Sequence, residues 1–299
     1  MLNLLYEWLR DVDIPGWGML QYISFRSAAA IITSLFITMG FGKKLISLLQ
    51  RKQIGEEIRD LGLEGQMQKK GTPTMGGLMI LASIVIPTLL FADLKNIYII
   101  LMLITTVWLG GIGFIDDYIK VFLKDKQGLA GKFKILGQVS LGMIVVATLY
   151  LSDDVVVREK IRNSDGEYKR EIVTDNLTGK QEVRFVTREI KSTKTTIPFI
   201  KNHEFDYAWI VAFMGKSSEY LRWLVYALAI ILIIVAVSNA ANLTDGIDGL
   251  AAGTSAVSGA TLGVLAYLSG NIIYSGYLNI MYIPHIGELS IFISAFIGA

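Results

Sequence analysis

The sequence predicts an all-α polytopic membrane protein with about six full transmembrane helices, a shorter seventh and a small polar insert. Hydrophobic residues make up 53% of its 299 positions, and its mean hydropathy is positive. Such values are typical of polytopic membrane proteins and lie outside the usual range of soluble domains. The chain has no cysteine, so it offers no thiol nucleophile, zinc thiolate site or disulfide.

Apolar runs define the predicted helices. A bilayer core about 30 Å thick needs about 20 apolar residues in a helix. Runs of that kind lie near residues 20–42, 75–92, 97–115, 134–151, 222–241 and 251–269. A seventh run begins near Ile286 and reaches only Ala299, so we expect the sequence to stop inside a helix. The stretch from Met1 to Gly18 lacks the basic start and cleavage site of a signal peptide and is expected to be interfacial.

Lysine and arginine in the short loops predict the orientation of these helices. The loops near 43–74 and 116–134 are rich in basic residues, whereas the loop near 93–96 has only Lys95. The two basic loops are therefore expected in the cytoplasm, with the amino terminus outside. Counting helices onward places the segment from Asn242 to Gly249 on the cytoplasmic side too.

Residues 152–221 form a polar insert between two membrane regions, residues 1–151 and 222–299. Its acidic and basic residues balance, and loops longer than about 60 residues escape the positive-inside rule. We expect this insert outside the cytoplasm. Within it, residues 171–187 alternate around an Asn-Leu-Thr-Gly turn, which predicts a β-hairpin.

Two adjacent carboxylates, Asp116 and Asp117, end the third apolar run in the sequence Gly-Phe-Ile-Asp-Asp-Tyr-Ile-Lys. Acids near membrane helices tend to lie at their ends or to face polar cavities. The pair could simply mark a helix end. Two like charges 4 Å apart repel by about 4 kcal/mol at an effective dielectric constant of 20. A divalent cation or nearby lysines would relieve that repulsion.

A second acidic segment, Asn-Leu-Thr-Asp-Gly-Ile-Asp-Gly, spans residues 242–249. The spacing of Asp245 and Asp248 would place both on one face of a starting helix. The simpler interpretation is that Thr244 or Asp245 caps the next helix. Capping leaves Asn239 and Asn242 unexplained, because both are amides at the end of an apolar run.

Basic residues accompany the acids. The segment Lys-Lys-Gly-Thr-Pro-Thr-Met-Gly-Gly at 69–77 can cradle a phosphate through its backbone amides, or it can be a structural entry loop. Positive charge after Asp117 fixes topology and can at the same time accompany a phosphorylated lipid; it comes from Lys120, Lys124, Lys132 and Lys134. The carboxylate and amide oxygens of the two acidic segments suit Mg²⁺, which takes one or two carboxylates together with phosphates and water.

The motifs at 69–77, 113–120 and 242–251 resemble those of the phospho-N-acetylmuramoyl-pentapeptide-transferase family, within the polyprenyl-phosphate N-acetylhexosamine-1-phosphate transferases. The resemblance covers about 20–150 and 222–299 and leaves the insert unexplained. It implies a Mg²⁺-dependent enzyme of the bacterial inner membrane, with a cytoplasmic active site, that converts UDP-MurNAc-pentapeptide and undecaprenyl phosphate to lipid I and UMP. Later family motifs are absent before Ala299, so we expect an incomplete catalytic domain that need not be active alone.

Family roles transfer only onto matching positions. The aspartates Asp116, Asp117 and Asp245 match the catalytic group around the metal and the reacting phosphates. The positions expected to bind substrate are Lys69, Thr74, Lys120, Lys124, Lys132, Asn239, Asn242 and Asp248. The expected partners are the two substrates and the bilayer, without nucleic acid, and a homodimer stays open.

Two other functions remain compatible with these residues. A related polyprenyl-phosphate GlcNAc-1-phosphate transferase shares the acidic motifs and the lipid acceptor. A cation-coupled transporter also uses intramembrane acids, but those acids should lie near the bilayer midplane in broken helices.

Overall fold

The structure, a computed structural model, is mostly α-helical with small two-stranded sheets. It describes residues 16–51, 75–125, 127–161, 163, 165, 169–174, 181–197, 204–212, 218–245 and 249–299. The chain divides into two compact units. Unit 1 comprises Met1–Thr148, Ala227–Ala266 and Glu288–Ala299, and unit 2 comprises Leu149–Tyr226 and Tyr267–Gly287.

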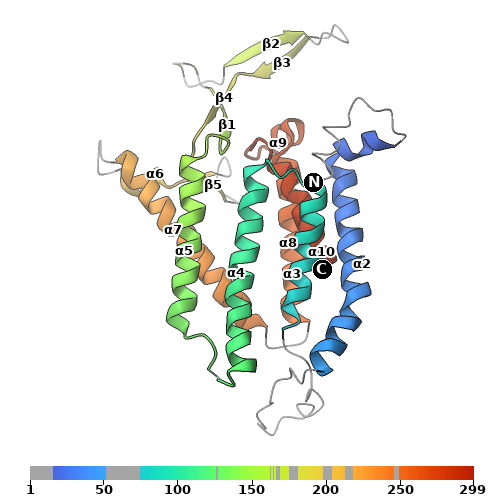
Figure 1. Cartoon of the computed structure of the whole chain (residues 1–299). Helices are drawn as coiled ribbons and strands as arrows, with labels where there is room; N and C mark the ends of the chain where they lie inside the picture. Colours follow the sequence, from blue (N-terminus) through green and yellow to red (C-terminus); the bar gives the residue numbers. More distant parts are fainter. Residues whose placement is uncertain are drawn as a thin grey trace. The chain divides into compact units, whose positions relative to one another are not determined.

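The long helices of unit 1 follow the apolar runs of the sequence (Figure 1). A 3₁₀ turn, η1 (Trp17–Gln21), precedes the first of them. The described helices long and apolar enough to cross a membrane are α2 (Ile23–Arg51), α4 (Ile97–Phe122), α5 (Gly131–Leu151), α7 (Ser218–Thr244) and α8 (Leu250–Ser269). Five of the six predicted full spans therefore have a helix of sufficient length among the described residues.

The predicted span near 75–92 is shorter than we expected. Its helix, α3 (Gly77–Phe91), has 15 residues and a length of about 22 Å at 1.5 Å per residue, less than the hydrocarbon core. The predicted short run from Ile286 also forms helix, first as the 3₁₀ turn η5 (Ile286–Glu288) and then as α10 (Leu289–Gly298).

Helix α4 shows how local sequence sets the ends of a helix. It begins after Asn96, whose side chain accepts hydrogen bonds from the backbone N–H groups of Tyr98 and Ile99 and so caps the helix. We expected the helix to end before Asp116, but it continues to Phe122. Both aspartates of the pair therefore lie inside its last turns.

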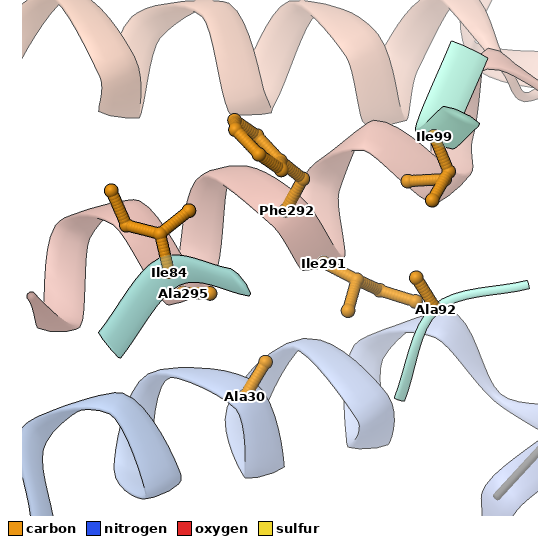
Figure 2. Close-up of a cluster of buried hydrophobic side chains, with 7 residues drawn as sticks. All are labelled: Ala30, Ile84, Ala92, Ile99, Ile291, Phe292 and Ala295. Carbon is orange, nitrogen blue, oxygen red and sulfur yellow. The ribbon is translucent and has the colours of Figure 1, made fainter. Parts of the chain in front are cut away.

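The core of unit 1 lies where α10 packs against α2, α3 and α4 (Figure 2). The buried apolar side chains of this core are Ala30, Ile84, Ala92, Ile99, Ile291, Phe292 and Ala295. Small residues let α2 and α10 approach closely, because a Cβ added to Gly298 would lie 2.5 Å from the carbonyl oxygen of Ile31. The Ser34 hydroxyl also donates to the carbonyl of Ala295 at 2.7 Å.

A buried ion pair joins the same helices. The Arg26 guanidinium donates to both carboxylate oxygens of Glu288, at 2.8 and 2.5 Å, and to the carbonyl of Phe91. Glu288 also accepts the backbone N–H of Asp93 at 3.0 Å. The pair therefore connects the start of α10 to α2 and to the segment between α3 and α4.

Unit 2 contains the polar insert, whose described residues form three antiparallel strand pairs. The pairs are β1 (Val157–Lys160) with β4 (Thr187–Ile190), β2 (Arg170–Thr174) with β3 (Gln181–Phe185), and β5 (Lys194–Thr196) with β6 (Glu204–Asp206). The unit also contains the short helices α6 (Ala208–Val211) and α9 (Ile272–Leu278). The strands predicted within 171–187 are the β2 and β3 pair, with Thr174 opposite Gln181, and the predicted turn lies outside the described residues.

Charged residues of the insert pair with one another across its strands. The Lys194 ammonium lies 2.5 Å from Glu159 and 3.2 Å from Glu204. Burial lowers the pKa of Lys194, but hydrogen bonds to these two carboxylates raise that pKa by more, so the net direction is upward. Arg158 pairs with Glu189 at 2.6 Å and lies 4.8 Å from the ring centre of Tyr282.

Candidate active site

Asp116 is a buried carboxylate near the end of α4. Its Oδ2 lies 2.9 Å from the Lys120 ammonium, one helical turn later. Its Oδ1 lies 2.9 Å from the Lys134 ammonium of α5 and accepts the Leu129 backbone N–H at 2.8 Å. Of the two ways to relieve repulsion between adjacent aspartates, the structure shows lysines bound to the first of the pair.

The loop between α4 and α5 reaches Asp116 because Gly128 has no side chain. Gly128 adopts a φ of +65°, in the left-handed region that glycine tolerates best. A Cβ at this position would lie 2.5 Å from Asp116 Oδ1 and 2.7 Å from the Cε of Lys120. The glycine therefore allows the next residue, Leu129, to donate its N–H to the carboxylate.

Helix α5 connects α7 to the carboxylate cluster, which consists of Asp116, Lys120 and Lys134. One turn after Lys134, the buried side chain of Gln138 accepts a hydrogen bond of 2.8 Å from the Nδ2 of Asn239 in α7. The helices pack closely at Gly142, where a Cβ would lie 2.8 Å from Ile231 Cγ1 and 3.2 Å from Ile231 Cα. The polar ends of α4 and α7 are thus both tied to the first turns of α5.

The predicted phosphate segment also adjoins α4. Lys69 and Thr74 lie outside the described residues. Met75, which follows Thr74 directly, is buried against Leu49, with Val121 packed against the same cluster. Since Val121 lies one turn after Asp117, the end of the segment at 69–77 is close to the last turns of α4.

The remaining predicted residues differ in their surroundings. Asp117 is half-buried in α4, and Lys124 and Lys132 are exposed. The Lys132 ammonium lies 5.2 Å from the ring centre of Phe133. Asn242 and Asp245 are exposed at the end of α7, whereas Asp248 lies outside the described residues.

The capping interpretation of Thr244 is wrong. Its hydroxyl donates to the carbonyl of Ala240, four residues earlier in α7, at 2.8 Å. Thr244 is therefore the last residue of α7 and not a cap of α8, which begins at Leu250.

The described residues do not bring the three predicted metal ligands together. Across these ranges, no group of three or more acidic or histidine side chains forms an arrangement that could hold a metal ion. Both oxygens of Asp116 are bound to lysine ammonium groups. Lysine ammonium groups and the Leu129 N–H thus already occupy three of the roughly four lone-pair sites of this carboxylate.

Three residues outside the predicted set shape this site: Lys134, Gly128 and Gln138. The sequence motifs predict for Lys134 only a role in topology or phosphate attraction, and they do not include Gly128 or Gln138. A signal for Gln138 exists in the sequence, because it is the only amide side chain in the apolar helix α5. Polar side chains inside membrane helices usually serve contacts between helices.

Two family descriptions match the chain. Residues 69–81 match phospho-N-acetylmuramoyl-pentapeptide-transferase signature 1, and residues 174–293 match Glycosyl transferase family 4. The second match and the full-length alignments below include residues of the insert, which we had expected to stand outside the resemblance.

Curated relatives match along the whole chain. Phospho-N-acetylmuramoyl-pentapeptide-transferase of Parabacteroides distasonis is 55% identical over 299 residues, covering 100% of this chain and 69% of the relative. The proteins of the same name from Flavobacterium psychrophilum and Flavobacterium johnsoniae are 55% and 54% identical, with 71% and 72% of each relative covered. The chain belongs to the phospho-N-acetylmuramoyl-pentapeptide-transferase family.

Proposed function

We propose that this protein transfers phospho-MurNAc-pentapeptide from UDP-MurNAc-pentapeptide to undecaprenyl phosphate, which forms lipid I and releases UMP. Family membership supports the reaction, since the relatives carry the name of that transferase. The reaction takes place at the cytoplasmic face of the bacterial inner membrane, where the basic loops of the sequence are expected. Residues 152–221 lie on the opposite side.

The observation that carries this proposal is the cluster of Asp116, Lys120 and Lys134 at the turn between α4 and α5. Phosphoryl transfer depends mainly on positioning and on stabilisation of charge. The ion pairs with Asp116 restrict the side chains of Lys120 and Lys134, which would otherwise be mobile. Their ammonium groups are therefore pre-organised to bind phosphate oxygens. Lys124 and Lys132 add exposed positive charge in the same loop region.

Asp116, Asp117 and Asp245 are the carboxylates that we assign to Mg²⁺. Mg²⁺ takes oxygen ligands and commonly uses one or two protein carboxylates, with substrate phosphates and water completing its shell, so two of these aspartates would be enough to hold the ion. When bound, the ion neutralises charge on the diphosphate. Lys69, Thr74, Asn239, Asn242 and Asp248 are assigned to the nucleotide sugar.

A direct assay tests the proposal. The purified full-length protein in lipid nanodiscs is given UDP-MurNAc-pentapeptide, undecaprenyl phosphate and Mg²⁺, and UMP release is measured. We expect release to stop with EDTA and to return with added Mg²⁺. Substituting UDP-GlcNAc as donor distinguishes the related GlcNAc-1-phosphate transferase, and release only with that donor would contradict the proposal.

Variants connect the activity to the site. Asp116→Asn and Asp245→Asn should each lower UMP release by about a hundredfold or more, the range for loss of one strong electrostatic contact in a transition state. Asp153→Asn is the matched control, because Asp153 is fully exposed in the insert. If Asp116→Asn inserts normally and turns over like the unmodified protein, Asp116 has no part in the reaction.

A further inference from the structure

The hydrogen bond between α5 and α7 settles the orientation of a side-chain amide. Asn239 Nδ2 lies 2.8 Å from the carbonyl oxygen of Val235 and 2.8 Å from Gln138 Oε1. A backbone carbonyl only accepts hydrogen bonds, so the atom facing Val235 must be the nitrogen of the amide. Both N–H groups of Asn239 are then used within the protein.

This orientation decides which atom Asn239 can offer to a ligand. Within the described residues, no hydrogen bond reaches Asn239 Oδ1. Toward a ligand, Asn239 therefore offers an acceptor oxygen and no hydrogen-bond donor. An acceptor does not bind a phosphate oxygen, but it does bind an N–H or hydroxyl group, such as the imide of a nucleobase or the hydroxyl of a sugar.

Gln138 enforces the orientation from a neighbouring helix. It is buried, and its Oε1 takes the N–H that Val235 cannot take. Without that acceptor, the outer N–H of Asn239 would lose its partner, and the amide would be held by one hydrogen bond, to Val235, instead of two. Gln138 also lies one turn from Lys134, which holds Asp116, so a single helix sets the positions of both groups.

We propose that Gln138 is a positioning residue that fixes the Asn239 amide with its carbonyl oxygen presented to an N–H or O–H donor of the nucleotide-sugar substrate. The inference rests on the proposed function for the identity of that substrate. It assigns to Asn239 a task distinct from phosphate binding. Helix α5 then positions two groups at once, since its Lys134 contacts Asp116 and its Gln138 contacts Asn239.

The central test compares Gln138→Leu with Gln138→Glu in the full-length protein. Leucine has no acceptor, whereas glutamate keeps an acceptor oxygen at the position of Oε1. For Gln138→Leu we expect the KM for UDP-MurNAc-pentapeptide to rise about three- to tenfold, the fold-change that corresponds to one hydrogen bond between membrane helices. The kcat and the KM for undecaprenyl phosphate should stay unchanged, because the lost contact binds the donor equally well in the ground state and in the transition state. Gln138→Glu should restore the donor KM.

A double-substitution cycle covers the case in which one variant folds poorly. Asn239→Leu combined with Gln138→Leu should bind the donor no more weakly than Asn239→Leu alone, since the two residues act as one unit. Ser140→Ala is the matched control in α5, because among the described residues the Ser140 hydroxyl bonds only to Leu136 of its own helix. The thermal midpoint is measured for every variant.

Several outcomes would overturn the inference. They are an unchanged donor KM in Gln138→Leu, equal rises in both KM values, additive losses in the double variant, or a folded Gln138→Glu that restores nothing. Direct binding of UDP alone, compared with binding of the complete donor, shows whether the recognised group lies on the nucleotide or on the sugar peptide. A protein that binds the donor but releases no UMP overturns the proposed function, while the same binding comparison still decides the role of Gln138.

Discussion

Removal of the Glu288 carboxylate should lower the free energy of unfolding of unit 1 more than a surface substitution does. Glu288 accepts two hydrogen bonds from Arg26 and one from the backbone of Asp93, and both charged side chains are buried. In Glu288→Leu the guanidinium keeps only the carbonyl of Phe91 as a partner among the described residues. Its Nε is already buried without an acceptor in the described structure, so the arginine has no alternative partner there.

The size of the loss follows from this geometry. Breaking a buried ion pair by removing one partner costs about 3–5 kcal/mol, because it leaves a buried charge without compensation. We expect Glu288→Leu to lower the free energy of unfolding by that amount. The measurement is reversible unfolding in mixed micelles with increasing SDS, followed by intrinsic fluorescence.

A second variant isolates the effect of the unpaired charge. Replacing both partners, as in Arg26→Leu with Glu288→Leu, should recover most of the loss, since a buried ion pair exchanged for apolar residues is often neutral. Asp153→Ala provides the exposed control, because its contact with Lys191 spans 3.4 Å at a fully exposed carboxylate. The reasoning is refuted if Glu288→Leu unfolds like the unmodified protein, or if the double variant is as unstable as the single one.

Three further predictions concern other parts of the molecule. Gly128→Ala should lower UMP release about tenfold or more, because alanine is strained at a φ of +65° and its Cβ would meet Asp116 Oδ1. The raised pKa of Lys194 should add stability to unit 2 that is fully present below the unfolded pKa of about 10.4 and is lost as pH rises through the higher folded pKa. Gly298→Ala should cost about 1–3 kcal/mol, because the new methyl group meets the backbone oxygen of Ile31.

Each of these predictions has its own check. Gly131→Ala, which would meet no atom within 4 Å, should leave UMP release unchanged, and an active Gly128→Ala would disprove the role of that glycine. For Lys194, the difference in unfolding free energy from Lys194→Met should be constant below pH 10 and shrink above it. A difference that grows with pH would reverse the assigned direction. For Gly298→Ala, SDS unfolding at the unmodified midpoint would contradict close packing of α10 on α2.

Much of the fold could be predicted from the sequence, because hydropathy and strand alternation are local properties. Apolar runs identified the five long helices, and alternation around residues 175–180 identified the β2 and β3 strands. Helix ends were less accurate. Helix α4 extends to Phe122, past the end of its apolar run at residue 115, and the contact between Lys120 and Asp116 one turn earlier supports these last turns.

The sequence by itself determined the chemical groups of the site: carboxylates, lysines and amides at the ends of apolar runs, with motifs specific enough to indicate the family. Only the tertiary structure decided which of these groups meet. Lys132 and Lys134 look equivalent in sequence, but a helix turns about 200° over two residues, and only Lys134 contacts Asp116. Gln138 meets Asn239 across 101 positions, and Arg26 meets Glu288 across 262. Such contacts depend on how helices pack, which no local pattern encodes.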